Sequence, residues 1–353
     1  MVLNMDEILI KAVALKCSDT HITVGVPPMC RVDGQLMSID GYDVLSAEDT
    51  KVLAFQLVNE NQANKLEANG EVDFSYSIPS TGRFRVNIFK QRGSYSVVLR
   101  VLSNKIPSID ALGLPAVFKD LAMKPRGLIL VTGPTGSGKS TTLAAMIDYI
   151  NENKRGHILT LEDPIEYLHK HKRCIVNQRE IGEDSQTFSS ALRAALREDP
   201  DVILVGEMRD LETVSIAVSA AETGHLVLST LHTVNAPQTI DRIIDMFPSE
   251  QQQQIKVQLS GVLQGVISQQ LMRIRGSDGR VAAMEVLIMN DAIRNVIREG
   301  KTHQIPSMMQ TATAQGMMSM DYSLSQLVKS NKISLQDALL HCSDQEMLKR
   351  YLA

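Results

Sequence analysis

The sequence contains no tryptophan, and aromatic residues make up only 4% of its 353 positions. Proteins that bind single-stranded nucleic acid stack bases on aromatic side chains. They also carry an excess of cations, whereas the net charge here is −4. We therefore expect no nucleic-acid partner, which disfavours a ring-shaped DNA translocase. The net charge does not exclude nucleic-acid binding by a local basic pore within an oligomer.

The four cysteines include no Cys-X-X-Cys pair. Structural zinc sites and disulfide frameworks usually show such spacings, so neither is expected, and reduced thiols in a cytoplasmic protein fit the cysteine content. No stretch approaches the roughly 18 consecutive apolar residues of a transmembrane helix. No basic region precedes an apolar run at the N-terminus, so we expect no secretory signal. A membrane role would have to come through partners.

Length and composition indicate two or three domains, with 44% apolar residues to build their cores. Residues 1–102 mix helical and strand patterns, which predicts a compact α+β domain. Its expected elements are a helix over 6–16, strands over 21–26, 82–89 and 94–102, and a helix running from Ser46 toward Leu66. Residues 103–115 contain prolines and a glycine with little periodicity, as an interdomain linker does.

Residues 116–353 are expected to form a second domain in which strands alternate with helices. The expected strands cover 127–132, 157–162, 202–207 and 225–231, and the helices cover 141–153, 187–197 and 211–223. This alternation predicts an α/β fold with a mainly parallel sheet and helices on both faces. From about Pro248 the chain is expected to be mostly helical, with one strand over 280–287.

The most specific motif lies between an apolar run and an alanine-rich stretch. Residues 133–140 follow the pattern Gly-X-X-X-X-Gly-Lys-Ser, so a strand, a glycine turn and a helix start occur in the order of a phosphate-binding loop. Lys139 can reach the β- and γ-phosphates, and the Ser140 hydroxyl can ligate Mg²⁺. A glycine-rich turn with a chance lysine is the weaker alternative. The motif predicts nucleotide binding by Gly133, Pro134, Thr135, Gly136, Ser137, Gly138, Lys139, Ser140 and Thr141.

Three further strand ends carry polar side chains, and ligands of parallel sheets bind beyond the carboxyl ends of the strands. Glu162 can activate the attacking water or bind Mg²⁺ through water, and Glu207 is expected to hold the Mg²⁺ shell. His232, with Thr230, lies where it can sense the γ-phosphate. Taken alone, solvated acids at a turn and a structural histidine explain the same residues.

Two charged features lie outside the nucleotide motif. The first is a set of arginines on the expected strands of the first domain, at Arg83, Arg85, Arg92 and Arg100. An arginine from another subunit can neutralise the γ-phosphate and raise the rate about a thousandfold, although a solvated strand face is the simpler alternative. The second is an expected amphipathic helix over 291–299, where Arg294 and Arg298 share an exposed face beside Glu299.

Together these motifs resemble the secretion and type IV pilus motor ATPases over nearly the whole chain. Residues 133–140 match the family's Walker A motif, and its Asp box, Walker B segment and His box resemble residues 161–166, 202–210 and 225–233. Its PAS-like N-terminal domain resembles Ser18–Ile22, Gly25–Pro28 and Arg31–Gly34. Residues 292–299 read AIRNVIRE, similar to the AIRNLIRE element of the pilus retraction members. This last motif is the most discriminating.

The resemblance implies a PAS-like N-terminal domain followed by a RecA-like P-loop domain with a helical C-terminal part. It also implies a homohexamer with ATP and Mg²⁺ between the two domains. Arg85 and Arg100 are the arginines that would reach a neighbour's site, and His232 would belong to the catalytic set. Glu162 resembles the catalytic glutamate, and Glu207 the acid associated with Mg²⁺. Arg294, Arg298 and Glu299 would couple the motor to its partner.

The function implied is ATP-driven retraction of type IV pili, which powers twitching motility. The expected partner is an inner-membrane pilus platform protein, and the expected place is the cytoplasmic side of that membrane. An added N-terminal region and a tetracysteine element, usual in extension and secretion members, are missing from this sequence, which favours retraction. The alternatives are an accessory retraction ATPase working beside a second motor, an extension or secretion ATPase, and a nucleotide-gated scaffold that hydrolyses little.

Overall fold

The computed structural model describes residues 3–102 and 105–353, which form two compact units. The first comprises the chain up to Lys105 together with Pro164–Leu168, and the second comprises Ile106–Asp163 and His169–Ala353. Within the expected linker, residues 103–104 lie outside the described residues. From Ile106 onward that segment belongs to the second unit, where Ile109 and Leu114 are buried in the core.

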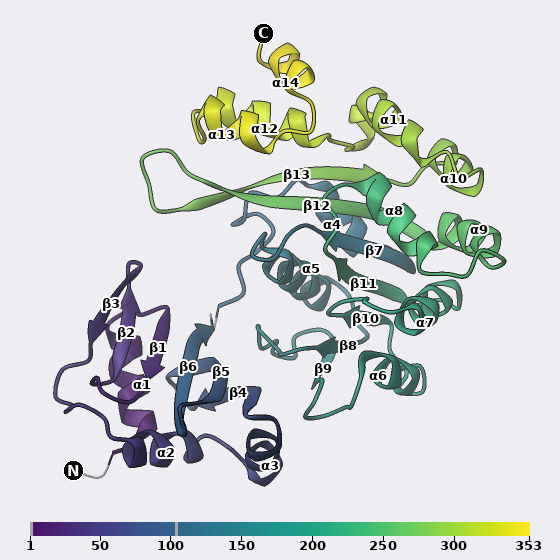
Figure 1. Ribbon diagram of the computed structural model, residues 1–353. Helices are drawn as coiled ribbons and strands as arrows, with labels where there is room; N and C mark the ends of the chain where they lie inside the picture. The colour runs from purple at the N-terminus through teal and green to yellow at the C-terminus, as the bar shows by residue number, and fades with distance from the viewer. Residues whose placement is uncertain (1–2, 103–104) are drawn as a thin grey trace. The chain divides into compact units, whose positions relative to one another are not determined.

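The first unit is an antiparallel sheet with helices packed on it (Figure 1). The strand order is β3-β2-β1-β6-β5-β4. The strands are β1 (Asp19–Ile22), β2 (Met29–Val32), β3 (Gln35–Ser38), β4 (Glu71–Ile78), β5 (Gly82–Gln91) and β6 (Ser94–Leu102), and the helices are α1 (Met5–Ala14), α2 (Ala47–Phe55) and α3 (Glu60–Asn69). Ile8 and Leu9 of α1 meet Phe84 and Leu99 of the sheet in one core. This is the α+β class predicted for residues 1–102.

Two details of this unit were predicted wrongly. The strand expected over 21–26 already ends at Ile22. The single helix expected from Ser46 toward Leu66 is two helices, because each has its own N-terminal capping box. In the second box, the Asn59 side chain accepts from the Gln62 N–H and the Gln62 side chain accepts from the Asn59 N–H. A reciprocal cap of this kind begins a new helix, so the chain breaks between α2 and α3.

The second unit is a mainly parallel sheet with the strand order β13-β12-β7-β11-β10-β8-β9. Its strands are β7 (Gly127–Thr132), β8 (His157–Glu162), β9 (Ile175–Glu180), β10 (Val202–Val205), β11 (Leu226–Leu231), β12 (Leu263–Arg273) and β13 (Arg280–Ile288). Only β13 among the described strands of this sheet runs antiparallel to its neighbour. The predicted α/β class is therefore confirmed.

Helices cover both faces of this sheet. They are α4 (Val117–Ala122), α5 (Lys139–Asn153), α6 (Phe188–Ala195), α7 (Leu211–Glu222), α8 (Ala236–Asp245) and α9 (Gln252–Val262). Along β7, Leu128 and Leu130 join the core beneath α6–α9, whereas Ile129 and Val131 join the core beneath α4 and α5. Side chains alternate between the two faces of a strand, so the continuous apolar run of β7 contributes residues to the hydrophobic cores on both faces of the sheet.

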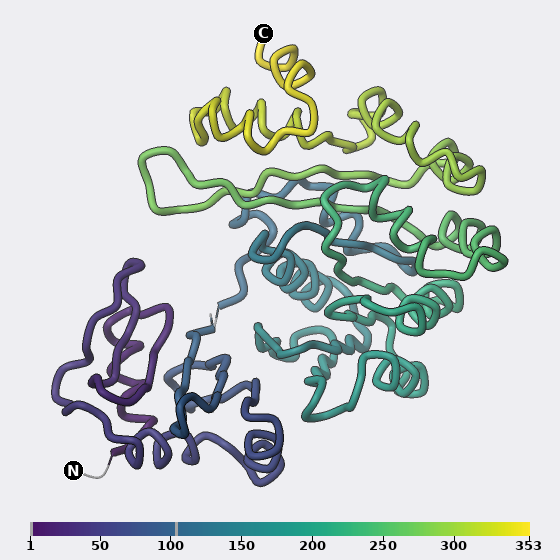
Figure 2. Tube along the Cα trace, viewed as in Figure 1, coloured from purple at the N-terminus to yellow at the C-terminus, as the bar shows by residue number. Residues whose placement is uncertain are grey.

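The chain after β13 consists of helices α10 (Asp291–Arg298), α11 (Ile305–Thr311), α12 (Met320–Lys329), α13 (Leu335–His341) and α14 (Gln345–Leu352), with short 3₁₀ turns at Thr302–Gln304 and Thr313–Gln315. In Figure 2 the yellow C-terminal helices run beside the β12–β13 hairpin. Met272 and Ala283 of the hairpin pack there against Leu324 and Leu348. Within residues 3–102 and 105–353, no helix has both the length and the apolar character needed to cross a membrane.

One expectation for this region was wrong: Leu263–Arg273 is a strand, where helix was expected. Strand β12 pairs in parallel with β7, the strand that leads into the phosphate-loop motif. On its other side β12 pairs with β13, and Gly265 permits close packing there, because a Cβ atom on Gly265 would lie 3.0 Å from the Leu287 carbonyl oxygen. The strand that was wrongly expected to be helical, β12, therefore lies next to the strand that leads into the 133–140 motif.

Candidate active site

The predicted phosphate-binding loop connects the end of β7 to the start of α5. Gly133, Gly136 and Gly138 have φ angles of 139°, 79° and 89°, in the left-handed region that residues with a side chain rarely adopt. Helix α5 has 15 residues, and no side chain caps its first turn. The N-terminus of a helix attracts anions, as in nucleotide-binding loops.

The side chains of the loop divide into an exposed and a buried set. Pro134 and Thr135 are exposed at the tip, as is Ser140 at the start of α5, whereas Ser137 is buried. The Lys139 ammonium donates to the carbonyl oxygens of Gly133 at 2.8 Å and Pro134 at 3.1 Å. Thr141 is half-buried in the first helical turn. The loop thus holds a cation against its own backbone, beside the helix N-terminus.

The other predicted strand ends lie along the same edge of the sheet, because β7, β11, β10 and β8 are parallel neighbours. β10 ends at Val205 rather than at Glu207, and Glu207 lies just beyond the strand. Its carboxylate is 2.7 Å from the Arg209 Nε and 3.7 Å from the His232 Nε2. The structure therefore brings Glu207 and His232 together, and it adds Arg209, which sequence reasoning did not include.

Glu162 ends β8 and receives two hydrogen bonds that the sequence did not reveal. The Thr160 hydroxyl donates to its Oε1 at 2.6 Å, and the Gln178 amide donates to the same oxygen at 3.0 Å. Gln178 lies on β9, which pairs in parallel with β8. Strand β9 was not predicted from the sequence, and Gln178 belongs to no motif. Only the strand pairing identifies it.

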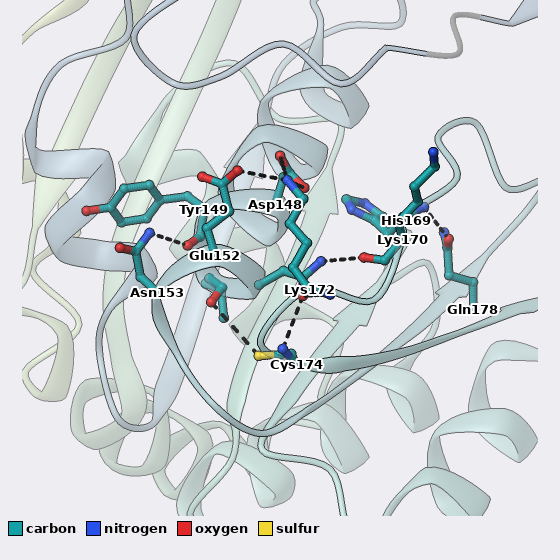
Figure 3. Close-up of polar contacts among 11 residues, drawn as sticks. Asp148, Tyr149, Glu152, Asn153, His169, Lys170, Lys172, Cys174 and Gln178 are labelled. Carbon is teal, nitrogen blue, oxygen red and sulfur yellow. Dashed lines mark hydrogen bonds and ion pairs between the residues drawn. The ribbon is translucent and has the colours of Figure 1, made fainter.

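The segment before β9 is fastened to α5, the helix that begins at the phosphate-binding loop (Figure 3). Lys172 forms ion pairs with Asp148 and Glu152, each at 2.8 Å. The backbone N–H of His169 donates to the Gln178 Oε1 at 2.7 Å, and burial lowers the pKa of the His169 imidazole to about 4. The amide that holds Glu162 is thus itself fixed by a segment anchored to α5.

Thr230 does not have a side chain free to sense a phosphate. Its hydroxyl donates to the Gly206 carbonyl oxygen at 2.6 Å, and the residue is 6% exposed. It therefore ties β11 to the turn that precedes Glu207. His225, at the other end of the strand, has its Nδ1 2.9 Å from the Ala220 carbonyl oxygen. Of the polar residues expected on this strand, His232 alone is half-exposed at the site.

The loop after His232 is anchored by a buried acid. The backbone N–H of Ala236, the first residue of α8, donates to the Glu285 Oε1 at 2.7 Å. Burial, with a smaller contribution from the nearby Asp321 carboxyl, raises the pKa of the Glu285 carboxyl to about 7. Glu285 is therefore a buried residue that supports the site by holding the start of α8.

Arg85 and Arg100 lie in the first unit, directly opposite each other in the register of β5 and β6. Arg85 pairs with Asp73 at 3.4 Å, and Arg100 pairs with Asp19 at 2.9 Å. Burial works to raise the pKa of the Asp19 carboxyl, but hydrogen bonds and the charge of Arg100 bring it below its usual value. The side chains of Arg85 and Arg100 are 42% and 68% exposed, so both remain accessible to another group.

The motif over 292–299 forms the predicted helix, α10, but its arginines differ. Arg298 and Glu299 are exposed, and Glu299 pairs with Lys301 at 2.8 Å. Arg294 is half-buried, contrary to the exposed position expected, and donates to the backbone carbonyls of Ser260 and Gly261 at the end of α9. Carbonyls at a helix C-terminus lack partners within the helix and attract cations. Arg294 therefore caps α9.

Among the described residues, no group of three or more histidine, cysteine, aspartate or glutamate side chains could hold a metal ion. Magnesium does not need such a cage, because it usually takes one or two protein oxygens together with phosphates and water. The exposed Ser140 hydroxyl and the Glu207 carboxylate are oxygen donors of this kind. These residues fit a magnesium ion that is bound together with a nucleotide.

Comparison with known proteins agrees with this geometry. The sequence profile of the family described as "Type II/IV secretion system protein" matches residues 2–339. The chain is 49% identical over 336 residues to the type IV pilus retraction ATPase PilT of Pseudomonas aeruginosa, covering 95% of this chain and 97% of that protein. It is 48% identical over 321 residues to a twitching motility protein of Neisseria gonorrhoeae, covering 91% and 86%.

A crystal structure described as the pilus retraction motor PilT with bound ADP has the same fold as this chain. The two superpose with a TM-score of 0.93 at 52% identity, and the match covers 99% of each chain. The phosphate-binding loop, the acids at the neighbouring strand ends and these similarities lead to one assignment. The chain belongs to the Type II/IV secretion system protein family, and it is an ATPase.

Proposed function

We propose that this protein is a motor that uses ATP hydrolysis to retract type IV pili. The observation that carries the proposal is the similarity, over nearly the full length of both chains, to a protein named as a pilus retraction ATPase. A complete phosphate-binding loop accompanies that similarity. A relative named for twitching motility, the movement that retraction produces, supports the same function.

In this proposal the loop of residues 133–141 binds the phosphates of ATP through its backbone N–H groups. The Lys139 ammonium exchanges its carbonyl partners for phosphate oxygens, a stronger pairing because both groups are charged. The Ser140 hydroxyl would hold Mg²⁺ and the Glu207 carboxylate would hold it through water, and the ion would neutralise negative charge on the transferred phosphate.

Glu162 is the proposed general base that orients and deprotonates the attacking water. The Thr160 hydroxyl and the Gln178 amide hold one oxygen of its carboxylate, which fixes the direction of the side chain. A base must be positioned before its proton affinity matters, so these two neighbours support the assignment. His232, in contact with Glu207, is proposed to report the presence of the γ-phosphate to the loop that leads into α8.

The proposed assembly is a homohexamer in which Arg85 and Arg100 serve the site of a neighbouring subunit. Two exposed cations lie side by side on one face of the first unit, each with a carboxylate partner that phosphate oxygens could replace. We assign residues 1–102 as the PAS-like domain, 103–115 as the linker and 116–353 as the RecA-like ATPase domain. ATP would shift these domains in each subunit in turn.

The proposed partner is an inner-membrane pilus platform protein, turned by the ring from the cytoplasmic side. The exposed Arg298 and Glu299 of α10 are the candidate contacts for coupling. Arg294 is better assigned to holding α9, because its guanidinium is used there. No helix of the described residues spans a membrane, so membrane association would come through the platform protein.

The experiment that tests this function is live imaging of fluorescently labelled pili in the native host after deletion of the gene. Long, abundant pili that extend but do not retract are the expected result. Cells without pili would indicate an extension or secretion ATPase. Retraction that continues at a reduced rate would indicate an accessory motor working beside a second one.

A further inference from the structure

Gln269 of β12 is a buried glutamine that lies against the phosphate-binding loop. Its predecessor Ser268 pairs in register with Thr132, the last residue of β7, and the two hydroxyls are 2.9 Å apart. Gln269 therefore lies at the point where β7 ends and the loop begins. The residue is only 3% exposed. A buried amide needs partners for both of its polar atoms.

Both partners of the Gln269 amide belong to the loop and to the first turn of α5. The amide nitrogen donates to the Ser137 carbonyl oxygen at 2.8 Å, and the amide oxygen accepts from the Thr142 hydroxyl at 2.8 Å. A carbonyl can only accept, so the amide can face Ser137 in only one orientation. Ser137 and Thr142 are 3% and 1% exposed. One side chain thus bridges the end of the loop and the helix that follows it.

Two glycines of the motif are packed against the same glutamine. A Cβ atom on Gly133 would lie 2.2 Å from the Gln269 carbonyl oxygen, and one on Gly138 would lie 2.9 Å from the Gln269 Nε2. Both distances are shorter than a real Cβ contact allows. These two glycines are therefore needed for the approach to Gln269, in addition to any approach to a phosphate.

The hydrogen bond to the Ser137 carbonyl also orients a backbone donor. A trans peptide unit is planar, so the Ser137 carbonyl and the Gly138 N–H point in opposite directions. Because Gln269 holds the carbonyl on the β12 side, the Gly138 N–H points away from β12. Gly138 is the residue immediately before α5, where an anion would meet the backbone donors of the helix.

We propose that Gln269 is a positioning residue for nucleotide binding: it presets the 137–138 peptide and the first turn of α5 so that their N–H groups face the phosphates. The inference rests on binding of the nucleotide at the predicted loop. It adds a residue outside the sequence motif, on a strand that follows the loop by more than a hundred positions in the chain.

The test is Gln269→Glu, which keeps the shape of the side chain but replaces the donating amide with a carboxyl. When ionised, the carboxyl cannot donate to the Ser137 carbonyl, whereas a protonated carboxyl can. Binding of fluorescently labelled ADP is measured for variant and wild type at about pH 8 and about pH 5.5, and the affinity ratio is taken at each pH. We expect the variant to bind at least about tenfold more weakly at the higher pH, and to recover most of this loss at the lower pH.

The matched control is Gln270→Glu, which makes the same change one position further along β12. The Gln270 amide oxygen lies 3.0 Å from the His341 Nδ1, away from the loop partners of Gln269. This variant should bind ADP as wild type does at both pH values. Wild-type affinity of Gln269→Glu at the higher pH, or a loss that is the same at both, would overturn the proposal. Failure of the wild-type protein to bind ADP would instead contradict the nucleotide site itself.

A second variant covers the case in which Gln269→Glu does not fold at the higher pH. Thr142→Val removes the hydroxyl that holds the amide oxygen and leaves the donor to Ser137 in place. Its ADP affinity should fall by about threefold to tenfold, with little change in the turnover of bound ATP. An unchanged affinity in this variant, measured on folded protein, would likewise overturn the role of Gln269.

Discussion

Replacing Glu285 with glutamine should stabilise the protein at alkaline pH and leave its stability unchanged in acid. Burial, together with the nearby Asp321 carboxyl, raises the pKa of this carboxyl from 4.5 to about 7. Between these values the native state keeps a proton that the unfolded chain has released. The stability contributed by this proton is therefore complete below about pH 4.5 and is lost as the pH rises through about 7.

The size of this effect follows from the two pKa values. Moving a carboxyl pKa from 4.5 to about 7 corresponds to about 3 kcal/mol of free energy of unfolding. Glutamine carries no charge at any of these pH values. Its amide oxygen can still accept from the Ala236 N–H, which in the wild-type protein lies 2.7 Å from the Glu285 Oε1. The variant should therefore equal wild type near about pH 4 and exceed it near about pH 8.

Thermal unfolding of the two proteins, followed at both pH values, measures this difference. A free-energy gain of this size raises the melting temperature of a unit of about 240 residues by several degrees. Glu250→Gln is the control, because this exposed residue loses the same charge without leaving a buried site. If Glu285→Gln is no more stable than wild type at the higher pH, or gains equally at both, the burial argument for Glu285 is wrong.

Four further substitutions test the roles of Glu162, of the α10 arginines and of His169. Glu162→Gln should lower the ATP turnover by at least about a hundredfold and leave nucleotide affinity nearly unchanged, and turnover near the wild-type rate would contradict its role as base. Arg298→Ala should stop retraction without changing ATP hydrolysis or the melting temperature. Arg294→Ala should instead lower the free energy of unfolding by about 1–3 kcal/mol, because the carbonyls at the end of α9 lose their hydrogen-bond donor. Loss of hydrolysis in Arg298→Ala would assign that residue to the catalytic apparatus. Burial keeps His169 neutral with a pKa of about 4, so the contribution of His169 to stability should fall by about 3 kcal/mol as the pH falls from about 6.5 to about 4, and His169→Phe should remove this contribution from the pH profile. Equal slopes in both proteins would refute this cause.

The strands that carry the chemistry were predictable because their signal is local. The bounds expected for 127–132, 157–162 and 94–102 agree with β7, β8 and β6. Each is a run rich in apolar or β-branched residues, which the strand pattern of the sequence marks. The phosphate-loop motif adds a fixed spacing between glycines, lysine and serine, so its conformation could be derived before any contact was known.

The supporting residues were not predictable, because their partners are distant in the chain. The segment 263–273 contains glutamines among apolar residues, a pattern that fits a helix surface as well as a strand. Its Ser268 and Gln269 can be buried because Thr132, Ser137 and Thr142 supply their hydrogen-bond partners. Gln178 is hidden in the same way on β9.

The face expected for Arg294 illustrates a different limit. Helical spacing correctly placed Arg294 and Arg298 one turn apart on α10. Spacing cannot show what lies within reach of a long side chain, and the end of α9 happens to lie within reach of Arg294. Arginine stems often lie along packed surfaces while the head binds a polar group. Two residues with the same local pattern therefore differ in exposure.

The central claim is that ATP hydrolysis at this loop drives pilus retraction, and one measurement tests it most directly. Retraction of labelled pili is recorded in the deletion strain after it receives either the wild-type gene or Lys139→Ala at matched protein levels. We predict that the wild-type gene restores retraction and that Lys139→Ala leaves pili extended, because the loop loses the cation that binds the phosphates. Normal retraction with Lys139→Ala would contradict the account.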